Sequence, residues 1–417
     1  MAIHESAAKG FSAGADAYER GRPDYAPEAV ATLVRVLRIG PRTRVLDLAA
    51  GTGKLTRQLM DTGAEIVAVE PVAEMRAKLV AAVPTAEALE GTAERIPVPN
   101  HSVDAVVVGQ AFHWFDGVRA LSEIHRVLKP TGSLGLVWQS RDATRPWIGR
   151  LNAIIDGATS GQPRFKDEGW RAAFDLLALF ERLQTASFPY VHRISAETVV
   201  DRVASISYVA AMPDERRAVV LDAVRDLVAN DPDTASAEVI DLPYRADVFW
   251  TRPTAIPAGP STGLVASVNV SPGGVPKLPV PATRIRYGGL DGDGHADRRN
   301  HGGPLQAVCL YSVESIERVA SEGHTAFPGA YGENLTLAGI DWHGLRAGDR
   351  LRIGANGPLL ELTDDATPCS KQAQWFIGGQ IGRISILKHP EDARWYASVV
   401  EEGPVAAGDR VELIRIA

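Results

Sequence analysis

The sequence has few of the features that mark exported or membrane proteins. It contains only two cysteines, Cys309 and Cys369, so a disulfide framework and a Cys-x-x-Cys zinc pair are both excluded. No stretch approaches the roughly 18 apolar residues of a membrane-spanning helix, and the first residues lack the apolar core of an export signal. These absences predict a cytoplasmic protein that does not interact with a membrane.

A local excess of positive charge is also missing. The net charge is −7, and lysine and arginine do not cluster along the chain, so nucleic acid is not expected as a partner. A small-molecule substrate is therefore favoured. Single hydrophobic cores stop growing at roughly 250 to 300 residues. The chain has 417 residues with 45% hydrophobic and 23% charged side chains, which predicts a globular protein of two domains.

The first half alternates short apolar segments with amphipathic ones. Strands are expected at residues 44–48, 65–69, 103–108 and 133–138, and helices at residues 27–37, 55–60, 72–83 and 118–128. Continuous apolar strands that alternate with helices are typical of a parallel sheet covered on both faces. The pattern predicts a doubly wound α/β domain. Residues 147–235 are expected to be mainly helical with a strand near 187–194, and residues 244–250 to form a late edge strand.

The composition changes after Trp250. Residues 252–261 are rich in proline and carry a single charge, on Arg252, which is typical of a linker. Short β-like segments follow at residues 262–270, 307–311, 334–337, 350–353, 359–363, 381–387 and 410–416, with one helix near 313–322. This half is predicted to be a mainly β barrel or sandwich. We therefore expect domains at residues 1–252 and 262–417, joined by a linker at 253–261 that lets them fold separately.

A glycine-containing motif lies at the first strand-to-helix turn. Residues 45–53 read VLDLAAGTG, and Glu70 ends the next strand, 23 residues after Asp47. Glycines let a backbone approach a ligand closely, and a carboxylate at the next strand end can accept both hydroxyls of a ribose. A nicotinamide cofactor would require a third glycine where Thr56 stands. The motif therefore predicts a nucleoside pocket.

This motif resembles motif I of class I S-adenosylmethionine-dependent methyltransferases, which usually have glycine at the position of Ala49. Residues 91–97, 102–104 and 125–132 match later family segments in the same order. Together with residues 11–23 and 110–115, they narrow the resemblance to type 11 small-molecule enzymes related to trans-aconitate methyltransferases, over residues 10–252. The resemblance implies that S-adenosylmethionine is bound by Asp47, Ala49, Gly51, Gly53, Glu70, Thr92, Ala93 and Glu94.

Methyl transfer is an in-line displacement, so the protein mainly aligns the acceptor and removes a proton. Gln110 and His113 follow the fourth strand, at the sheet edge where open α/β proteins bind ligands, and are the expected catalytic residues. A His113 that only packs beside the pocket is an equal alternative. Tyr18 and Arg22 are expected either on an N-terminal lid or as ordinary surface residues. Residues 109–112 lack the Asp/Asn-Pro-Pro-aromatic motif of nucleic-acid amino methyltransferases, which disfavours that class.

Three segments of the second half, at residues 292–304, 328–336 and 367–369, resemble the MOSC domain of molybdenum cofactor sulfurases, over residues 262–417. The resemblance implies binding of molybdenum cofactor (molybdopterin), and the terms molybdenum ion binding and pyridoxal phosphate binding accompany the family. Cys369 follows a proline in a loop, where a thiolate can ligate molybdenum or carry a persulfide. Cys309 lies in an apolar run and is expected to be a buried structural residue.

Positive side chains and backbone amides near these segments are expected to meet the pterin phosphate. The expected binding residues are Arg298, Arg299, His301, Gly302, Gly303, Asn334 and Lys371. Zinc held by His295, His301 and Cys369 is an alternative whose spacing matches no zinc pattern.

The leading interpretation is a bifunctional fusion of a small-molecule methyltransferase with a MOSC domain that binds molybdenum cofactor or carries sulfur. Its expected partners are a methyl acceptor and, for the second half, molybdenum cofactor enzymes or a sulfur donor. One alternative is that the MOSC half reduces N-hydroxylated compounds at molybdenum. Another is a carrier or sensor in which the methyltransferase half only binds its ligand.

Overall fold

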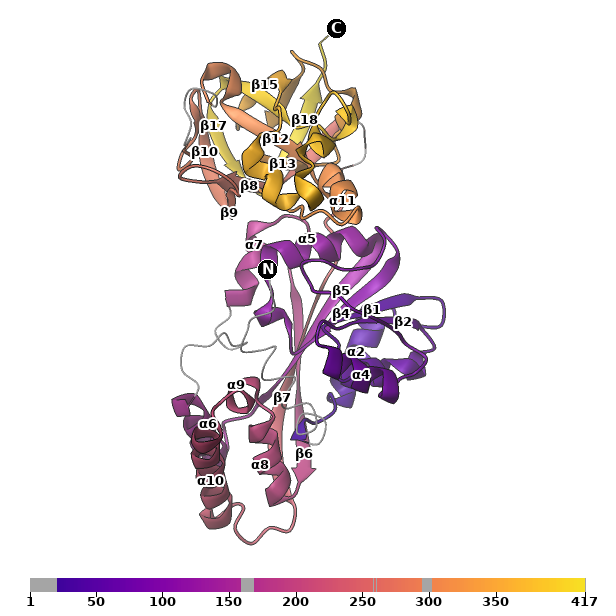
Figure 1. The fold of residues 1–417 in the computed structure, drawn as a ribbon, viewed down its shortest axis with the longest axis vertical. Helices are drawn as coiled ribbons and strands as arrows, with labels where there is room; N and C mark the ends of the chain where they lie inside the picture. Colours follow the sequence, from indigo (N-terminus) through magenta and orange to yellow (C-terminus); the bar gives the residue numbers. More distant parts are fainter. Residues whose placement is uncertain (1–20, 159–168, 258, 260, 295–301, 417) are drawn as a thin grey trace.

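The computed structural model describes residues 21–158, 169–257, 259, 261–294 and 302–416. Figure 1 shows three parts along the long axis: a β-rich domain at the top, an α/β sheet in the middle and a lobe of helices at the bottom. We find no helix among the described residues with the length and apolar composition of a membrane span.

The N-terminal half is built on a seven-stranded sheet with the order β3-β2-β1-β4-β5-β7-β6. Its strands are β1 (Arg44–Leu48), β2 (Glu65–Val69), β3 (Glu87–Leu89), β4 (Val103–Gly109), β5 (Leu128–Arg141), β6 (Gln184–Ile194) and β7 (Ile240–Thr251). The first five strands are parallel, and β7 runs antiparallel to both β5 and β6. The predicted doubly wound fold is confirmed.

One expectation about this sheet was wrong. Residues 244–250 were expected at the edge, but β7 lies between β5 and β6, and β6 forms the edge. The reason is the long antiparallel pairing of β6 with β7, from Gln184 opposite Trp250 to Ile194 opposite Ile240. Alternate burial along β6, unlike the continuous burial of β4, is typical of a strand with one face in water.

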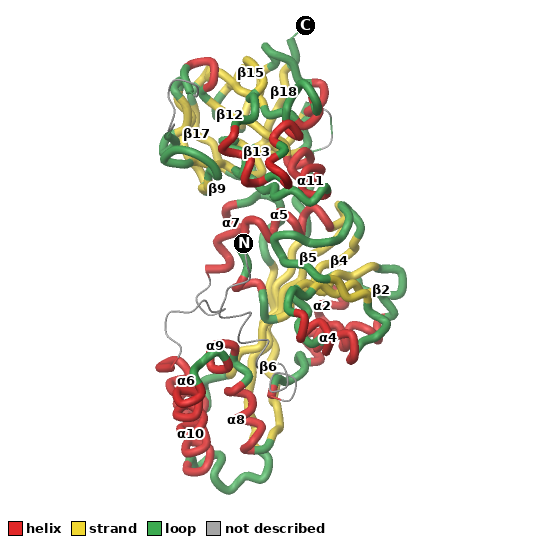
Figure 2. The backbone as a smooth tube through the Cα atoms, in the orientation of Figure 1, coloured by secondary structure: helices red, strands yellow, loops and turns green. Residues whose placement is uncertain are grey.

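Helices cover the sheet and form the separate lobe. They are α2 (Pro27–Val36), α3 (Lys54–Leu59), α4 (Ala73–Ala82), α5 (Gly117–Val127), α6 (Pro146–Ala158), α7 (Ala172–Leu176), α8 (Ala196–Ala204), α9 (Ser207–Ala210) and α10 (Asp214–Asn230). Helices α6, α8, α9 and α10 gather at the far ends of β6 and β7, away from the β-rich domain (Figure 2). They share a hydrophobic cluster of their own with these strand ends, which makes the lobe a distinct packing unit.

The C-terminal half is a closed barrel. Strands β13-β12-β16-β15-β14-β18-β8 follow one another around it, and the pairing of β13 with β8 closes the ring, with β9 added beside β8. Its elements are β8 (Thr262–Val270), β9 (Leu278–Val280), β12 (Val308–Ser312), α11 (Val313–Ser321), β13 (Leu335–Ala338), β14 (Arg350–Ile353), β15 (Leu359–Asp365), β16 (Trp395–Glu401) and β18 (Arg410–Ile414). A small sheet of β10 (Ala282–Arg286), β11 (Gly289–Leu290) and β17 (Gly403–Ala406) flanks it. Of the two expected architectures, the barrel is the one present.

The strand expected at residues 381–387 was also wrong. Residues Ile381–Ile384 form the short 3₁₀ helix η9, which follows η7 (Ser370–Trp375) and η8 (Ile377–Gly379). Only Ile384 of this helix is buried. A single apolar residue can be buried by a turn, so its apolar character does not require a strand.

The two halves share an apolar interface. Leu264, Ala266, Val313 and Ala338 of the barrel belong to the same buried cluster as the core around α5 and α7. The backbone NH of Ala178 donates to the carbonyl of Ala266 at 2.9 Å. Polar contacts also cross it: Glu317 on α11 meets the Nδ1 atom of His125 on α5 at 2.7 Å, and both side chains are largely buried.

This interface leads to a prediction about a chain cut within residues 253–261. We expect two folded fragments that remain associated, because separation would expose the shared apolar cluster and leave the Glu317 carboxylate without His125. Glu317→Gln should weaken the association about tenfold or more, since hydrogen bonds to charged groups contribute about 1.5 to 3 kcal/mol. Size-exclusion chromatography of the cut wild type and cut variant measures this. Fragments that separate at micromolar concentration would contradict the interface, and insoluble fragments would contradict the boundary.

Candidate functional site

The turn between β1 and α3 has an unusual backbone. Ala49, Gly51 and Gly53 have φ values of 58°, 59° and 83°, all in the left-handed region. This region costs an ordinary residue roughly 1 to 2 kcal/mol, so Ala49 holds a conformation that glycine would adopt at no cost. The tight turn brings the backbone of Gly51 beside the end of β2. The residues that the sequence singled out therefore build one compact loop.

Glu70 holds this loop through its carboxylate. Its Oε2 atom accepts from the backbone NH of Gly51 at 2.9 Å, and Oε1 accepts from the NH of Val72 at 2.8 Å. The side chain is buried, and burial raises the pKa of the carboxyl. Each oxygen retains a further lone pair. Glu70 can therefore fasten the loop and still accept hydrogen bonds from a ligand.

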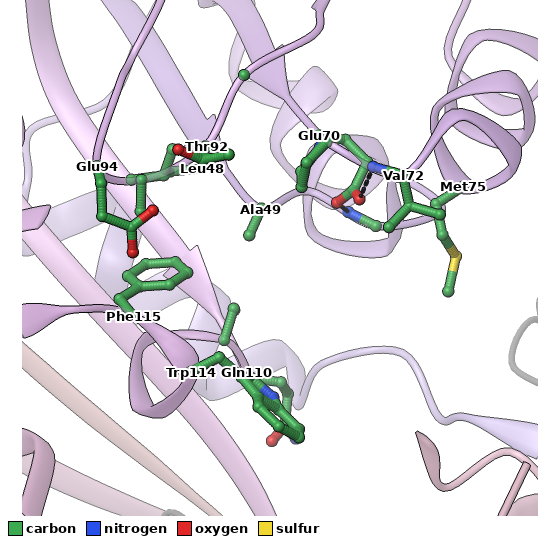
Figure 3. Close-up of a pocket in the computed structure, with 16 residues that line it drawn as sticks. Leu48, Ala49, Glu70, Val72, Met75, Thr92, Glu94, Gln110, Trp114 and Phe115 are labelled. Atoms are coloured by element: carbon green, nitrogen blue, oxygen red, sulfur yellow. Dashed lines mark hydrogen bonds between the residues drawn. The ribbon is translucent and has the colours of Figure 1, made fainter. Parts of the chain in front are cut away.

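A pocket opens beside Glu70, and its volume is about 820 Å³ including space open to solvent. Ala49, Gly51, Glu70, Thr92, Ala93 and Glu94, all expected binding residues, line it. Figure 3 shows Glu70, Val72 and Met75 on one side, Glu94 and Phe115 on the opposite side, and Trp114 below them with Gln110. Gly53 is not among the lining residues, and a Cβ at this position would lie 3.2 Å from the side chain of Leu79. The walls are mainly apolar, with a few polar groups placed to orient a ligand.

Asp47 lies under the loop and lines a smaller adjoining hollow with Gly51 and Lys54. Its Oδ2 atom accepts from the Thr56 hydroxyl at 2.6 Å. The pKa of Asp47 is raised from 3.8 to about 7, chiefly by burial and to a smaller extent by the nearby carboxylate of Glu70, while hydrogen bonds from Thr56 oppose the change. An aspartate in this state is protonated in part at neutral pH.

Asp47 therefore predicts a pH-dependent stability. Because its folded pKa of about 7 exceeds the unfolded value of 3.8, the folded state keeps the proton longer, and its contribution to stability falls as the pH rises from about 4 to 7. Asp47→Asn should raise the free energy of unfolding at pH 8 by up to about 4 kcal/mol and change it little near pH 4. Urea denaturation of both proteins across this range measures the difference. A variant-minus-wild-type difference independent of pH would contradict the assignment.

Gln110 and His113 differ in their relation to the pocket. Gln110 lines it and has a positive φ of 62°, a strained conformation that is often found at binding sites. Its Nε2 atom donates to the carbonyl of Gln139 at 3.0 Å. His113 is not among the lining residues, and its Nδ1 atom accepts from the indole NH of Trp138 at 3.2 Å. A catalytic role for His113 stays a prediction.

A second pocket, of about 660 Å³ including open space, lies in the barrel domain. Cys369, Asn334, Gly302 and Lys371, all singled out in the sequence, line it, whereas Gly303 does not. The expected binding residues Arg298, Arg299 and His301, and the zinc alternative's His295, lie outside the described residues. Within the described part of the chain, no group of three His, Cys, Asp or Glu side chains is arranged to hold a metal ion.

Cys309 belongs to this second pocket as well. It is buried, as expected, but the same side chain lines the pocket wall. Burial raises the pKa of the Cys309 thiol, and the guanidinium of Arg394, whose Nη1 atom lies 3.9 Å from the sulfur, opposes this change. The apolar run around Cys309 did not indicate that it lines a pocket. Successive side chains of a strand point to opposite faces, so Cys309 can face the cavity while its neighbours on β12 pack in the core.

The comparisons with known proteins cover both halves. Residues 46–136 match the family model of the methyltransferase domain, and residues 297–412 match that of the MOSC domain. The uncharacterized methyltransferase Rv3342 of Mycobacterium tuberculosis is 43% identical over 234 residues, which is 56% of this chain and 91% of that protein. The chain belongs to the methyltransferase family. A MOSC domain follows the methyltransferase domain, so the fusion inferred from the sequence is confirmed.

Protein YiiM of Escherichia coli is 27% identical to this methyltransferase–MOSC chain over 176 residues, 41% of the chain and 72% of YiiM. Among solved structures, a putative methyltransferase from an antibiotic biosynthesis pathway of Anabaena variabilis is 22% identical, covers 55% of this chain and 98% of its own, and has a TM-score of 0.42.

Sequence reasoning missed several pocket residues of the methyltransferase–MOSC chain. Leu48, Met75, Trp114 and Phe115 line the first pocket, and Lys277, Arg394 and Tyr396 line the second. The aromatic pair lay within the recognised segment 110–115, so a signal was present. Arg394 had no comparable signal in the sequence, because its contacts are with distant residues. It is 4% exposed and donates to the carbonyls of Tyr331 and Ala366, 63 and 28 residues away.

Proposed function

We propose that the first pocket binds S-adenosylmethionine and that the enzyme transfers its methyl group to a small-molecule acceptor that enters beside Gln110. The observation that carries this proposal is the Glu70 carboxylate, buried at the pocket wall with lone pairs free for ribose hydroxyls. The apolar side chains of Leu48, Met75 and Phe115 suit an adenine ring. The residues present therefore fit this ligand.

The bound ligand would supply an electrophilic methyl group on a sulfonium, and the protein would supply alignment. Gln110 lines the pocket, held by its own strained backbone and by Gln139, and would orient the acceptor. Trp114 and Phe115 would exclude water. A neutral imidazole has a single acceptor nitrogen, and in His113 this is Nδ1, which accepts from Trp138. This arrangement favours a packing role for His113 over removal of a proton from the acceptor. Calorimetric titration with S-adenosylmethionine tests the proposal: one site per chain is expected, and no binding would refute it.

For the barrel domain we propose binding of molybdenum cofactor in the second pocket, with Cys369 as the metal ligand. Lys371 and Arg394 place positive charge around this pocket, and Lys277, which is paired with Asp293, also lines it. The buried Nε atom of Arg394 has no hydrogen-bond partner among the described residues, which marks a donor that a ligand can satisfy. A soft thiolate with cations nearby suits a metal-dithiolene carrying a phosphate. Elemental analysis of protein from a host that makes the cofactor tests this.

Two other roles use the same thiol pocket. A Cys369 persulfide would make the domain a sulfur carrier, and an added sulfur on the Cys369 peptide would be seen by mass spectrometry. Reduction of N-hydroxylated compounds would require bound molybdenum and would appear as turnover of N-hydroxylated bases. Transfer of a methyl group to any acceptor would exclude the pure sensor alternative.

A further inference from the structure

A third hollow adjoins the first pocket on the side of the helical lobe. It is lined by Arg22, Pro23, Tyr25, Lys54, Gln110, Gln139, Arg202 and Tyr244. Gln110 also lines the proposed S-adenosylmethionine pocket, and Tyr25 and Lys54 also line the hollow beneath the Gly51 turn. A molecule in this third hollow would therefore lie next to the methyl donor. This is the position required of an acceptor.

Arg202 is the most informative residue of the hollow. It lies on α8 of the helical lobe and is 6% exposed. Its Nε atom donates to the hydroxyl of buried Tyr244 at 3.0 Å, but its Nη1 atom has no hydrogen-bond partner among the described residues. Burying a guanidinium without a counter-charge costs several kcal/mol. A buried cation with an unused donor, facing a cavity, indicates a site for an anion.

The charges around Arg202 strengthen this reading. Arg22 and Lys54 line the same hollow, and Arg141 on β5 lies close enough to Arg202 for the two to repel. The pKa of Arg141 is lowered to about 10, chiefly by burial and also by the positive charges of Arg202 and Arg22. Acidic groups near this cluster include Asp24, which contacts Lys54, Asp47, which lines the hollow beneath the Gly51 turn with Lys54, and Asp156, near Arg141. Lys54 thus has acidic partners nearby, whereas buried Arg202 forms no ion pair with a carboxylate among the described residues.

Local packing holds the cluster in place. A Cβ on Gly21 would lie 2.7 Å from the backbone nitrogen of Arg202, so only glycine fits this close approach. Arg22, the next residue, lines the hollow. Tyr244 comes from β7, so the cluster joins residues from the N-terminal segment, the sheet and the lobe. The lobe therefore contributes Arg202, a residue distant in sequence from the methyl donor motif, to the wall of the hollow.

We propose that this hollow binds an oxyanion of the methyl acceptor, a carboxylate or a phosphate ester, with Arg202 and Arg22 as the recognising residues. The proposal rests on the proposed methyltransferase function and specifies its substrate class as an organic anion. The acceptor's anionic group would pair with the guanidinium groups, and its remainder would extend past Gln110 toward the methyl donor. Planar guanidinium groups suit both oxyanions because they donate two parallel hydrogen bonds.

The first test measures anion binding without turnover. Thermal unfolding of the full chain is measured at neutral pH in the presence of S-adenosylhomocysteine. Malonate and inorganic phosphate are compared with chloride at the same ionic strength. A rise in Tm with malonate or phosphate, but not chloride, is expected, and the anion with the larger rise identifies the preferred oxyanion. Equal curves in all three salts would overturn the proposal. A rise caused by S-adenosylhomocysteine alone reports the methyl donor pocket separately, so the two proposals can fail independently.

The second test uses variants. Arg202→Met should abolish the malonate or phosphate response and, because it removes an unsatisfied buried charge, should raise the Tm of the ligand-free protein. A purely structural arginine would instead lower it. Tyr244→Phe removes the hydroxyl but keeps the cation, so most of the response should remain. Arg193→Gln is the matched control, since Arg193 is exposed on β6 and pairs with Asp241. An unchanged anion response in Arg202→Met would overturn the assignment.

The third test uses catalysis. Wild type is incubated with methyl-labelled S-adenosylmethionine and a panel of carboxylic acids, phosphate monoesters, amines and neutral alcohols. Labelled product is expected only from acceptors that carry an oxyanion, and Arg202→Met should lower kcat/KM for them at least tenfold while calorimetry shows unchanged S-adenosylmethionine binding. Efficient methylation of a neutral acceptor by both proteins would refute the substrate class.

Discussion

Replacement of Glu70 by alanine is expected to weaken S-adenosylmethionine binding by one to two orders of magnitude. The carboxylate accepts from the backbone of Gly51 and Val72 and has lone pairs left for two ribose hydroxyls. Its loss removes hydrogen bonds to a charged group, about 1.5 to 3 kcal/mol, and also frees the loop. Isothermal titration calorimetry of wild type and variant measures the change in Kd.

Two further variants separate the causes. Glu70→Gln keeps one carbonyl oxygen but turns an amide NH2 toward a backbone NH, so it should lie between wild type and Glu70→Ala. Glu74→Ala is the matched control, because Glu74 is exposed in the first turn of α4. Equal affinity of wild type and a folded Glu70→Ala would remove Glu70 from the binding site.

The second large effect concerns the two cysteines. Protein from a host that makes the pterin cofactor is expected to contain molybdenum, and Cys369→Ser should lose most of it, because a serine oxygen is a harder and poorer ligand. Cys309→Ser should leave the metal content nearly unchanged. Both thiols line the same pocket, but burial raises the pKa of Cys309 and so disfavours its thiolate. Elemental analysis of the three proteins decides between them.

The pair also controls for stability. Cys309→Ser places a hydroxyl in a buried position, so its thermal unfolding should fall to lower temperature without loss of metal per folded chain. Equal molybdenum in wild type and folded Cys369→Ser, or none in wild type, would defeat the ligand role. Loss of metal in Cys309→Ser alone would assign the metal ligand to Cys309 instead of Cys369. If Cys369 is not a metal ligand, mass spectrometry of the Cys369 peptide would test for a persulfide.

Much of the fold could be predicted because it depends on local patterns. The strands β1, β2 and β4 and the apolar face of α5 follow from residues that are close together in the sequence. The same holds for the turn from Asp47 to Gly53, whose residues belong to one short motif. The barrel strands β8 and β14 were expected with their observed bounds. By contrast, β16, β10 and β17 were not expected, because their partners lie far along the chain and only pairing makes them strands.

The sequence by itself determined the methyltransferase and MOSC identities and the Glu70 pocket, since each depends on short contiguous motifs whose geometry follows from one strand and one turn. Only the tertiary structure decided that β7 lies inside the sheet, that Cys309 shares a pocket with Cys369, and that α11 packs against α5. It alone brought Arg22, Arg141 and Arg202 together. Contacts between residues so far apart form only when long loops close, and no local periodicity encodes loop closure. A cluster of buried charges from distant segments therefore cannot be predicted from local sequence patterns.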